Sequence, residues 1–483
     1  MISASDFHTY FQLEECARRI WLEANRPGLK AEPSEFDQVL FRKGREHEEA
    51  HLATFPEHVR PAYPVGDLAA GAAATKSLLR QSRPVIYQGV LMSPDGGTAG
   101  IPDFLIREGD AYVIRDAKLA LNLDRHPEIP AQIGLYSRLL RDAAGLSVAR
   151  CEVLLGNGDL LPVPPVDVTG LVSRLCDIKS AHEEPDEAVG WSKCNTCGFC
   201  DHCWNDAVKA HDPAVVPGIE QGLRNALVGA GIARYEGVQK LGVRGLAGLR
   251  FQQKTRERQV GEKTAEKVLR QVRVLVSGKM EVLVPPDEPP VGLVAYFDIE
   301  SNPWDVGMET RVYLWGLLLD RSNGSPPEYW GTIARAGAEG DAAAWQAFLT
   351  RCGHLIEEFG DFPYVHYSHY EKTWITQYIQ RWGDHDGVGA KVLSLLWDME
   401  KRAIRGRLCL PVHSYGLKHV EKCAGFKRGQ GEYGALWSVG RYGALLEAAD
   451  DTARAAIENE LLTYNREDCV AMQRVLQWAC GFR

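Results

Sequence analysis

The pattern of apolar and polar positions predicts a chain of mixed helices and strands in three parts. Residues 1–210 mix helical and strand patterns and end in a group of cysteines, whereas residues 211–290 are basic and rich in glycine. The run Pro285–Pro290 has four prolines in six residues, which excludes regular helix or a central strand and predicts a linker. Residues 291–483 open with a buried-strand pattern, Val294–Glu300, and then alternate strands and helices.

Length and composition agree with a globular protein of several domains. The chain has 483 residues, of which 45% are hydrophobic and 25% are charged, close to ordinary globular usage. No apolar run approaches the roughly 18 residues that a membrane span needs; the longest, Val312–Leu319, has the length of a strand. The N-terminus has no basic segment followed by an apolar one, so we expect no signal peptide and a cytoplasmic protein. Twelve cysteines in such a compartment favour metal or cluster binding over disulfides.

A formal net charge of −9 argues weakly against a nucleic-acid ligand, but this average hides a basic segment. Between Arg224 and Lys279 the sequence has thirteen Lys or Arg residues against four Glu and no Asp, a local charge of +9. The glycine turn at Leu227–Ile232 joins short helical runs and resembles a helix–hairpin–helix module. In such modules backbone amides contact phosphate. The alternative is a helical linker with a solvated basic face.

Acidic and basic side chains of the first part have the spacing of a metal-dependent site. Asp116 and Lys118 lie two residues apart in a predicted strand, Tyr112–Leu119, so their side chains point to the same face. Asp103 can meet them from the neighbouring strand. Two carboxylates can hold a divalent metal ion, and a nearby lysine can position water or steady negative charge on a phosphate. His47, in a helical stretch, is a further candidate ligand.

These residues belong to an ordered series of motifs: G-x-x-H, G-x-x-D, D-x-K and Q-x-x-x-Y. The last motif places Gln132 and Tyr136 on one face of a helix. The series resembles the RecB-type branch of the PD-(D/E)XK nucleases. The resemblance implies His47, Asp103 and Asp116 as metal ligands and Lys118 as the catalytic lysine. It implies that Gln132 and Tyr136 contact DNA or support the site.

Four cysteines follow one another at intervals of three residues: Cys194, Cys197, Cys200 and Cys203. Four local thiolates could bind Zn²⁺ tetrahedrally. In the other arrangement Cys16 joins Cys194, Cys197 and Cys203, which resembles the iron–sulfur clamp of RecB-like nucleases and implies a [4Fe–4S] cluster. We favour the cluster, and Cys200 is then an additional thiol without an assigned role.

Acidic residues of the last part predict a second site. Asp298 and Glu300 lie two apart at the end of a strand, and hence on one face. Tyr464 and Asp468 lie four apart on one face of a predicted helix. Acids from a strand and a distant helix can gather two metal ions about 4 Å apart, which clamp the oxygens of a displacement at phosphorus. Tyr464 would orient the attacking water.

This order, D-x-E followed by Y-x-x-x-D, resembles the tyrosine subtype of the DEDD exonucleases, which have an RNase H-like fold. That family usually supplies a further Asp at the start of a helix, where this sequence offers Glu371 in the stretch Val365–Glu371. Asp398 is the other candidate for that acid. The segment Ser414–Val420 also resembles the family, in which such a turn precedes a helix.

Together the motifs resemble one family of RecB-like nucleases that carry a C-terminal RNase H-like exonuclease domain. The resemblance implies an α/β multidomain fold with a PD-(D/E)XK nuclease domain at 1–210, a helix–hairpin–helix-like linker at 211–290 and an RNase H-like domain at 291–483. It implies Mg²⁺ or Mn²⁺ as cofactor and single-stranded or unwound DNA as substrate, in repair, recombination or defence. The resemblance also implies a superfamily 1 helicase as partner, since such a helicase is often fused to or encoded near members of that family. The chain itself has no G-x-x-x-x-G-K-[ST] motif and hence no P-loop motor of its own.

Two other functions stay open from the sequence alone. One is an RNA-processing 3′–5′ exonuclease that uses only the C-terminal site. The other is a nucleic-acid-binding module with decayed sites, for which Glu371 in place of Asp would be a sign. Tight binding with a steep salt dependence and no hydrolysis would indicate the second.

Overall fold

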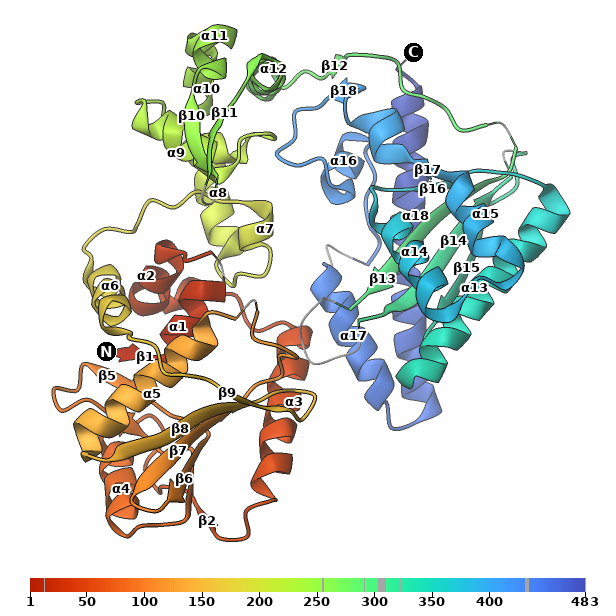
Figure 1. Ribbon diagram of the computed structural model, residues 1–483. Coiled ribbons are helices and arrows are strands. Elements are labelled where there is room, and N and C mark those ends of the chain that lie inside the picture. The colour runs from red at the N-terminus through yellow and green to blue at the C-terminus, as the bar shows by residue number, and fades with distance from the viewer. Residues whose placement is uncertain are drawn as a thin grey trace. The chain divides into compact units, whose positions relative to one another are not determined.

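The computed structural model of the chain (Figure 1) describes residues 1–12, 14–124, 126–253, 256–290, 292–302, 310–321, 323–430 and 434–482. These residues form two compact units. Unit 1 is built from residues 1–33 and 37–203, and unit 2 chiefly from residues 204–302 and 310–482. The basic segment, residues 211–290, lies within unit 2.

Unit 1 is organised around a mixed sheet of six strands. The strands are β2 (His58–Val59), β3 (Val85–Tyr87), β6 (Phe104–Glu108), β7 (Ala111–Ala117), β8 (Ser147–Leu154) and β9 (Leu160–Pro162), and helix α5 spans Glu128–Ala144. They pair in the order β2-β3-β6-β7-β8-β9. β6 and β7 are antiparallel, whereas β7 and β8 are parallel because α5 returns the chain between them.

A small sheet and several helices surround the main sheet of unit 1. The small sheet pairs β1 (Ile2–Ser3), β5 (Thr98–Gly100) and β4 (Leu91–Met92) in that order. The helices are α1 (Ala4–Gln12), α2 (Ala17–Asn25), η1 (Pro27–Leu29), α3 (Glu35–Leu52), α4 (Leu68–Arg80), α6 (Thr169–Ser180) and α7 (Trp191–Cys194). Helix α8 (Cys200–Ala210) begins in unit 1 and continues into unit 2. Ile129, Ile133 and Leu140 of α5 are buried in one core with Ile114 and Val153 of the sheet, as expected for an amphipathic helix.

The basic segment folds into short helices and one β-hairpin. Its elements are η2 (Pro213–Val215), α9 (Gln221–Gly229), α10 (Tyr235–Val238), η3 (Gln239–Leu241), α11 (Gly242–Ala247), β10 (Arg250–Gln253), β11 (Arg256–Gln259), α12 (Glu262–Ser277) and β12 (Glu281–Val282). The predicted glycine turn is present, since Gly231 has a φ of +82°. Residues 285–290 contain no helix or strand, as predicted. Helix α12 is fixed within unit 2, because Gln271 Nε2 donates to Leu410 O at 2.7 Å.

The remainder of unit 2 holds a five-stranded sheet (Figure 1). Its strands are β13 (Val294–Ser301), β14 (Val312–Asp320), β15 (Glu328–Ile333), β16 (Tyr364–His366) and β17 (Leu396–Asp398). They pair in the order β15-β14-β13-β16-β17. β13 is central, with an antiparallel neighbour in β14 and a parallel neighbour in β16. The predicted strands at Val294–Glu300 and Val312–Leu319 are therefore confirmed.

Helices pack on both faces of β14, which explains why its apolar run does not alternate. The further elements are α13 (Gly337–Phe359), α14 (Tyr370–Trp382), η4 (His385–Gly387), α15 (Val388–Leu395), η5 (Glu400–Ile404), β18 (Leu408–Cys409), α16 (Leu417–Cys423), α17 (Ala435–Glu447) and α18 (Asp451–Cys480). Trp315 contacts Trp345 of α13, with 5.2 Å between ring centroids. Leu318 lies in another core with Met472 of α18. Within the described ranges, every helix is too short or too polar to cross a membrane.

Candidate active sites

The first predicted group lies where β6 begins and β7 ends. Asp103 directly precedes β6, Asp116 lies in β7, and Lys118 follows β7. Asp103 Oδ2 accepts a hydrogen bond from the Ala117 N–H (2.7 Å), and Asp116 Oδ1 accepts one from the Asp103 N–H (3.3 Å). Lys118 Nζ lies 2.5 Å from Asp116 Oδ2. The structure therefore brings together both predicted carboxylates and the predicted lysine.

The charges of this group depend on one another. Burial raises the pKa of Asp103 well above its ordinary value, and the charge of Asp116 raises it further. Burial alone would lower the pKa of Lys118, but the charges of Asp116 and Asp103 outweigh it and the pKa rises. Lys118 thus stays protonated and offsets part of the acidic charge. The oxygen donors suit a hard divalent cation such as Mg²⁺ or Mn²⁺.

Of the two residues predicted on α5, only Tyr136 is shown by its electrostatics to lie near the acids. Burial raises the pKa of Tyr136, with further contributions from Asp116 and Asp103. A Cβ atom at Gly100 would lie 2.7 Å from the Tyr136 ring, so the glycine of the G-x-x-D motif allows this ring to approach. Gln132 Nε2 instead donates to the Ala4 carbonyl at 2.9 Å, which ties α5 to α1.

His47 lies in α3, and its Nε2 atom is buried without a hydrogen bond among the described residues. No group of three closely spaced ligand atoms in those residues includes His47, so its role as a ligand stays a prediction. The next residue, Glu48, acts on the acidic pair: after burial and Asp116, its charge helps to raise the pKa of Asp103. Glu48 Oε1 also accepts from Gln88 Nε2 at 2.8 Å. The sequence motif marked only the histidine, so Glu48 was missed.

The predicted cysteines gather around the start of α2. Cys16 directly precedes α2, and Cys197 and Cys203 pack against Trp21 of that helix together with Phe199. Burial raises the pKa of the Cys203 thiol to about 12, and Cys197, Cys194 and Cys16 contribute to the rise.

The arrangement of these thiols bears on the choice of metal group. A tetrahedral Zn²⁺ site with Zn–S bonds of about 2.3 Å places its sulfur atoms about 4 Å apart. Among the described residues, no three cysteine sulfurs lie within 4.8 Å of one another. Cys200 lies among the same thiols, because Cys194 and Cys197, after burial, raise its pKa to about 11. The donor set fits a thiolate-bound metal group, and both the cluster and Zn²⁺ stay predictions.

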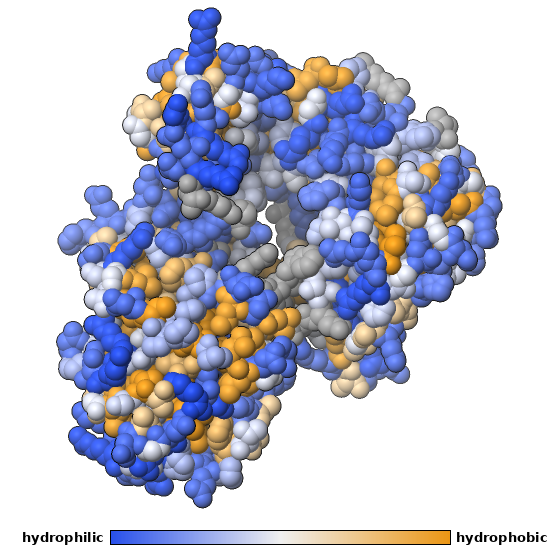
Figure 2. Space-filling model, viewed as in Figure 1, coloured by the Kyte–Doolittle hydropathy of each residue, from blue (hydrophilic) through white to orange (hydrophobic). Residues whose placement is uncertain are grey.

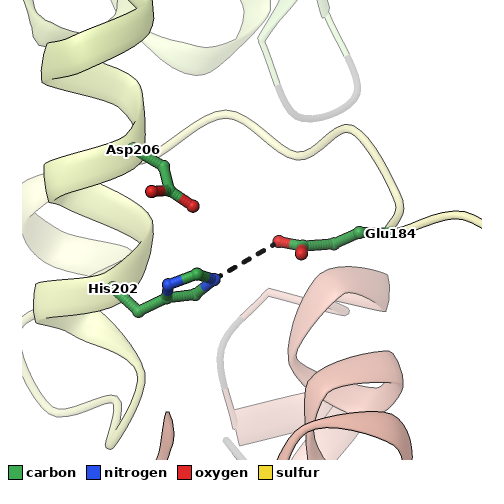
Figure 3. A group of neighbouring side chains, drawn as sticks. All are labelled: Glu184, His202 and Asp206. Atoms are coloured by element: carbon green, nitrogen blue, oxygen red, sulfur yellow. Dashed lines mark ion pairs between the residues drawn. The ribbon is translucent and has the colours of Figure 1, made fainter.

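An unpredicted group next to these cysteines combines two residues of α8 with Glu184, which lies between α6 and α7 (Figure 3). Ligand atoms of Glu184, His202 and Asp206 lie within 4.8 Å of one another. His202 Nε2 is 3.8 Å from Glu184 Oε1, the contact dashed in Figure 3. Glu184 also pairs with Arg18 of α2. These ion pairs tie the helix that follows Cys16 to the helix that carries Cys203.

The acids predicted in unit 2 form a compact triad. Asp298 and Glu300 project from β13, and Asp468 comes from α18. Their oxygen atoms lie within 4.8 Å of one another, and Glu300 and Asp468 are buried. Burial raises the pKa of Asp298 and of Glu300 well above ordinary values, and in both cases the charge of Asp468 adds to the rise. Three carboxylates so close together favour the binding of a cation, and their hard oxygen donors fit Mg²⁺ or Mn²⁺.

A chain of hydrogen bonds fixes Asp298 within the triad. Asn465 Nδ2 donates to Asp298 Oδ2 at 2.7 Å, and Tyr329 OH donates to Asn465 Oδ1 at 2.9 Å. A Cβ atom at Gly316 would lie 1.7 Å from Asn465 Oδ1, so only glycine leaves room for this amide. Sequence reasoning missed Asn465, although it stands next to Tyr464 in the motif.

The comparisons with known proteins agree with this geometry. Residues 295–480 match the RNase H superfamily. The C-terminal part of the chain is an RNase H-like domain. No curated protein matches the chain. The RNase H-like domain points to a nuclease-type hydrolase of nucleic acid, and nucleases of this kind use Mg²⁺ or Mn²⁺. The match does not extend to unit 1, where the PD-(D/E)XK and iron–sulfur assignments stay predictions.

Two cations enter the acidic site of the RNase H-like domain. Lys418 Nζ, in the first turn of α16, donates to Tyr464 OH at 3.1 Å. Arg428 donates from Nε and Nη2 to Glu421 (2.8 Å each), and its Nη2 also donates to Asp468 Oδ1 (2.5 Å). Burial raises the pKa of Asp468, while Arg428 and Lys418 oppose that rise. Arg428 was not predicted, because no motif marked it.

The fourth acid of the RNase H-like domain was predicted at Glu371, with Asp398 as the alternative. Glu371 lies buried in the first turn of α14, where Oε2 is 3.2 Å from His366 Nδ1. Burial and the charge of Asp468 are larger causes of the raised pKa values of Asp298 and Glu300, and the charge of Glu371 adds to them. Glu371 is not part of the triad itself. Asp398 at the end of β17 pairs with Lys401 (2.8 Å). Glu371 is therefore near the triad but held by a histidine.

Proposed function

We propose that the protein is a metal-dependent nuclease that hydrolyses phosphodiester bonds, with single-stranded or unwound DNA as the substrate and removal of nucleotides from an end as the mode. The observation that carries the proposal is the carboxylate triad of Asp298, Glu300 and Asp468 in an RNase H-like domain. A superfamily 1 helicase that delivers unwound DNA is an expectation supported by the sequence resemblance alone.

Each residue of the RNase H-like site has a distinct task in this proposal. The triad would hold Mg²⁺ or Mn²⁺, which when bound activates water and neutralises charge at phosphorus. Asn465 keeps the Asp298 carboxylate oriented through its 2.7 Å hydrogen bond. Tyr464 would hold the attacking water, and Lys418, which donates to the Tyr464 hydroxyl, would fix the direction of that hydroxyl.

We further propose a second hydrolytic site in unit 1. Asp103 and Asp116 would bind the metal ion, with His47 as the third ligand of the predicted set. Lys118, which is 2.5 Å from Asp116, would stabilise negative charge on the phosphate. Tyr136 and Gln132 would support this site, Tyr136 from beside the acids and Gln132 by holding α5 on α1.

Cys16, Cys194, Cys197 and Cys203 would hold a [4Fe–4S] cluster in this proposal, with Zn²⁺ as the alternative. The support is the gathering of partly buried thiols around the start of α2. A brown protein with broad visible absorbance and iron after anaerobic purification is expected. A colourless protein that contains zinc would overturn the cluster in favour of zinc.

The test uses single-stranded DNA and RNA of one sequence, labelled at the 5′ or the 3′ end, in Mn²⁺. Asp298→Ala should slow the formation of one set of products by at least about 100-fold, and Lys118→Ala the formation of the other set. Loss of a metal ligand or of a charge-stabilising group should raise the activation barrier by several kcal/mol. Asp361→Ala, an exposed acid of unit 2, is the control that should change neither part. Undiminished cleavage by the double variant Lys118→Ala with Asp298→Ala would show that neither site is catalytic. Faster cleavage of RNA than of DNA, lost in Asp298→Ala, would establish the RNA-processing alternative.

One observation favours a second candidate, a binding module without catalysis. Asp468 is bonded to Arg428, and Glu371 is bonded to His366, so two acids of the RNase H-like site already have protein partners. Intact substrate in Mn²⁺, together with binding that weakens steeply as salt rises, would establish this candidate.

A further inference from the structure

The hairpin of β10 and β11 presents two arginines on one of its faces. In the observed register Phe251 is opposite Arg258 and Gln253 is opposite Arg256. Because opposed residues of antiparallel strands share a face, these four side chains lie on the same side. The other face carries Arg250, Gln252, Glu257 and Gln259. The hairpin is thus two-sided, with a different charge arrangement on each side.

The two faces differ in how their arginines are paired. Arg250 Nη1 lies 2.9 Å from Glu257 Oε2, so this guanidinium is neutralised within the hairpin. Arg256 and Arg258 are exposed, and neither has an acidic partner among the described residues. In the described part of the chain, Glu220 approaches this face without pairing with either arginine. Its Oε2 atom accepts a hydrogen bond from Gln253 Nε2 at 2.6 Å. The face of Arg256 and Arg258 therefore carries unneutralised positive charge.

Packing at the base of the hairpin holds this face in place. A Cβ atom at Gly222 of α9 would lie 2.0 Å from the Gln252 carbonyl oxygen and 3.0 Å from the Phe251 ring. Gln259 Nε2 donates to the Ala247 carbonyl of α11 at 3.1 Å. The strands are thus anchored to α9 and α11, and the two arginines project from a fixed backbone.

The surroundings of the hairpin are polar and carry charges of both signs. Figure 2 shows hydrophilic residues over most of the visible surface of this part of the molecule. A pocket of about 240 Å³ adjoins the arginine face and is lined by Phe251, Arg258 and the acid Glu220, among others. Exposed Lys263 and Lys267 follow on α12, interspersed with exposed Glu262 and Glu266. Among the described residues of the hairpin, none is an exposed large hydrophobic side chain.

We infer that the face of Arg256 and Arg258 binds the phosphodiester backbone of a nucleic-acid strand. Residues two apart on a strand are separated by about 7 Å, so each guanidinium can contact its own phosphate of a backbone that carries one negative charge per nucleotide. A regular polyanion therefore matches two unneutralised arginines on a fixed strand. The inference extends the proposed function, because the same strand would be the substrate of the RNase H-like domain in the same unit.

Fluorescence anisotropy of the full chain tests this inference in EDTA, where binding is measured without hydrolysis. The probes are labelled 20-nucleotide oligothymidine, oligouridine and a DNA duplex of equal length. The double variant Arg256→Gln with Arg258→Gln should weaken binding to the single strand by about 25-fold at 0.1 M salt, and should lower the slope of log affinity against log salt by about 1.4, since each lost phosphate contact accounts for about 0.7. Which probe shows the largest change identifies the strand type.

Arg250→Gln and Arg256→Gln form a matched pair of single variants. Each removes one positive charge from the hairpin, Arg256→Gln from the arginine face and Arg250→Gln, the control, from the opposite face. The control should leave affinity and slope close to wild type. Arg256→Lys with Arg258→Lys should keep most of the binding, and circular dichroism verifies the fold of each variant. Wild-type binding by the double glutamine variant, an equal loss in Arg250→Gln, or equal displacement of the probe by polyglutamate would overturn the inference.

The failure of this inference can be distinguished from failure of the proposed function. If Asp298→Ala abolishes hydrolysis but the arginine variants bind as wild type does, only the role of the hairpin is refuted. If the arginine variants lose binding while no metal-dependent hydrolysis is found, the hairpin stands and the catalytic proposal fails.

Discussion

Gly316→Ala tests whether the amide of Asn465 holds the acidic triad in place. The added Cβ atom would lie 1.7 Å from Asn465 Oδ1 and 3.0 Å from Tyr329 OH. The first contact is far inside van der Waals distance, so Asn465 must move away. Its movement would break the 2.7 Å hydrogen bond to Asp298 and the 2.9 Å bond from Tyr329.

The expected magnitude follows from these contacts. Overpacking of a dense site costs about 1–3 kcal/mol, and a buried polar group that loses its partner costs about 1–3 kcal/mol. We expect Gly316→Ala to lower the free energy of unfolding by about 3–5 kcal/mol. Asn465→Ala alone should cost about 1–3 kcal/mol, because it removes the bond without a clash. In the double variant the clashing Asn465 atom is absent and the hydrogen bonds are already lost, so the two losses should fall short of additivity by about 3–5 kcal/mol, close to the whole Gly316→Ala effect.

Urea unfolding of the four proteins in this double-mutant cycle measures the coupling, and the hydrolysis rate in Mn²⁺ measures its effect on the site. Gly316→Ala and Asn465→Ala should both slow hydrolysis, and the double variant should be no slower than Asn465→Ala. Gly353→Ala, where the nearest atom to the added Cβ is an ordinary 3.6 Å away, is the control for the glycine substitution. If the losses in unfolding free energy of the two single variants add up to that of the double variant within about 0.5 kcal/mol, Asn465 does not hold the triad in the way described.

Three other substitutions test the remaining contacts. Arg428→Ala should tighten Mn²⁺ binding measured by calorimetry, since it frees the Asp468 oxygen bonded at 2.5 Å; weaker binding would mean that Arg428 helps to assemble the site. Gly100→Ala should destabilise unit 1 by about 1–3 kcal/mol, because its Cβ atom would lie 2.7 Å from the Tyr136 ring, and an unchanged urea midpoint would contradict this packing. Cys203→Ser should remove most of the bound iron, or zinc, from purified protein, while Cys176→Ser, an exposed cysteine elsewhere, should remove none.

The sequence predicted what depends on local periodicity. β13 and β14 were found because strands covered on both faces have uninterrupted apolar runs. The pairs Asp298 with Glu300 and Tyr464 with Asp468 were found because spacings of two and four residues place side chains on one face of a strand or helix. The structure places Asp298, Glu300 and Asp468 in one triad.

The residues that were missed act through contacts between distant segments. Arg428 lies 40 positions from Asp468, and Gln88 lies 40 positions from its partner Glu48. Asn465 matters only because β13 and α18 meet, and Gly316 only because Asn465 approaches it. No local spacing marks such pairs. The same reason explains why His47 was singled out in preference to Glu48.

The central position of β13 has a consequence for the order of folding. Its antiparallel pairing with β14 closes a short connection, whereas its parallel neighbour β16 comes only after α13, and α18 lies about 170 positions from Asp298. Loop closure favours near neighbours, so we expect the β13–β14 pair to form early and α18 to dock late. A partly folded chain would then carry Asp298 and Glu300 without Asp468. The proposed hydrolytic competence of the RNase H-like site would thus appear only with the final docking step, so an incompletely folded domain would not cleave nucleic acid at this site.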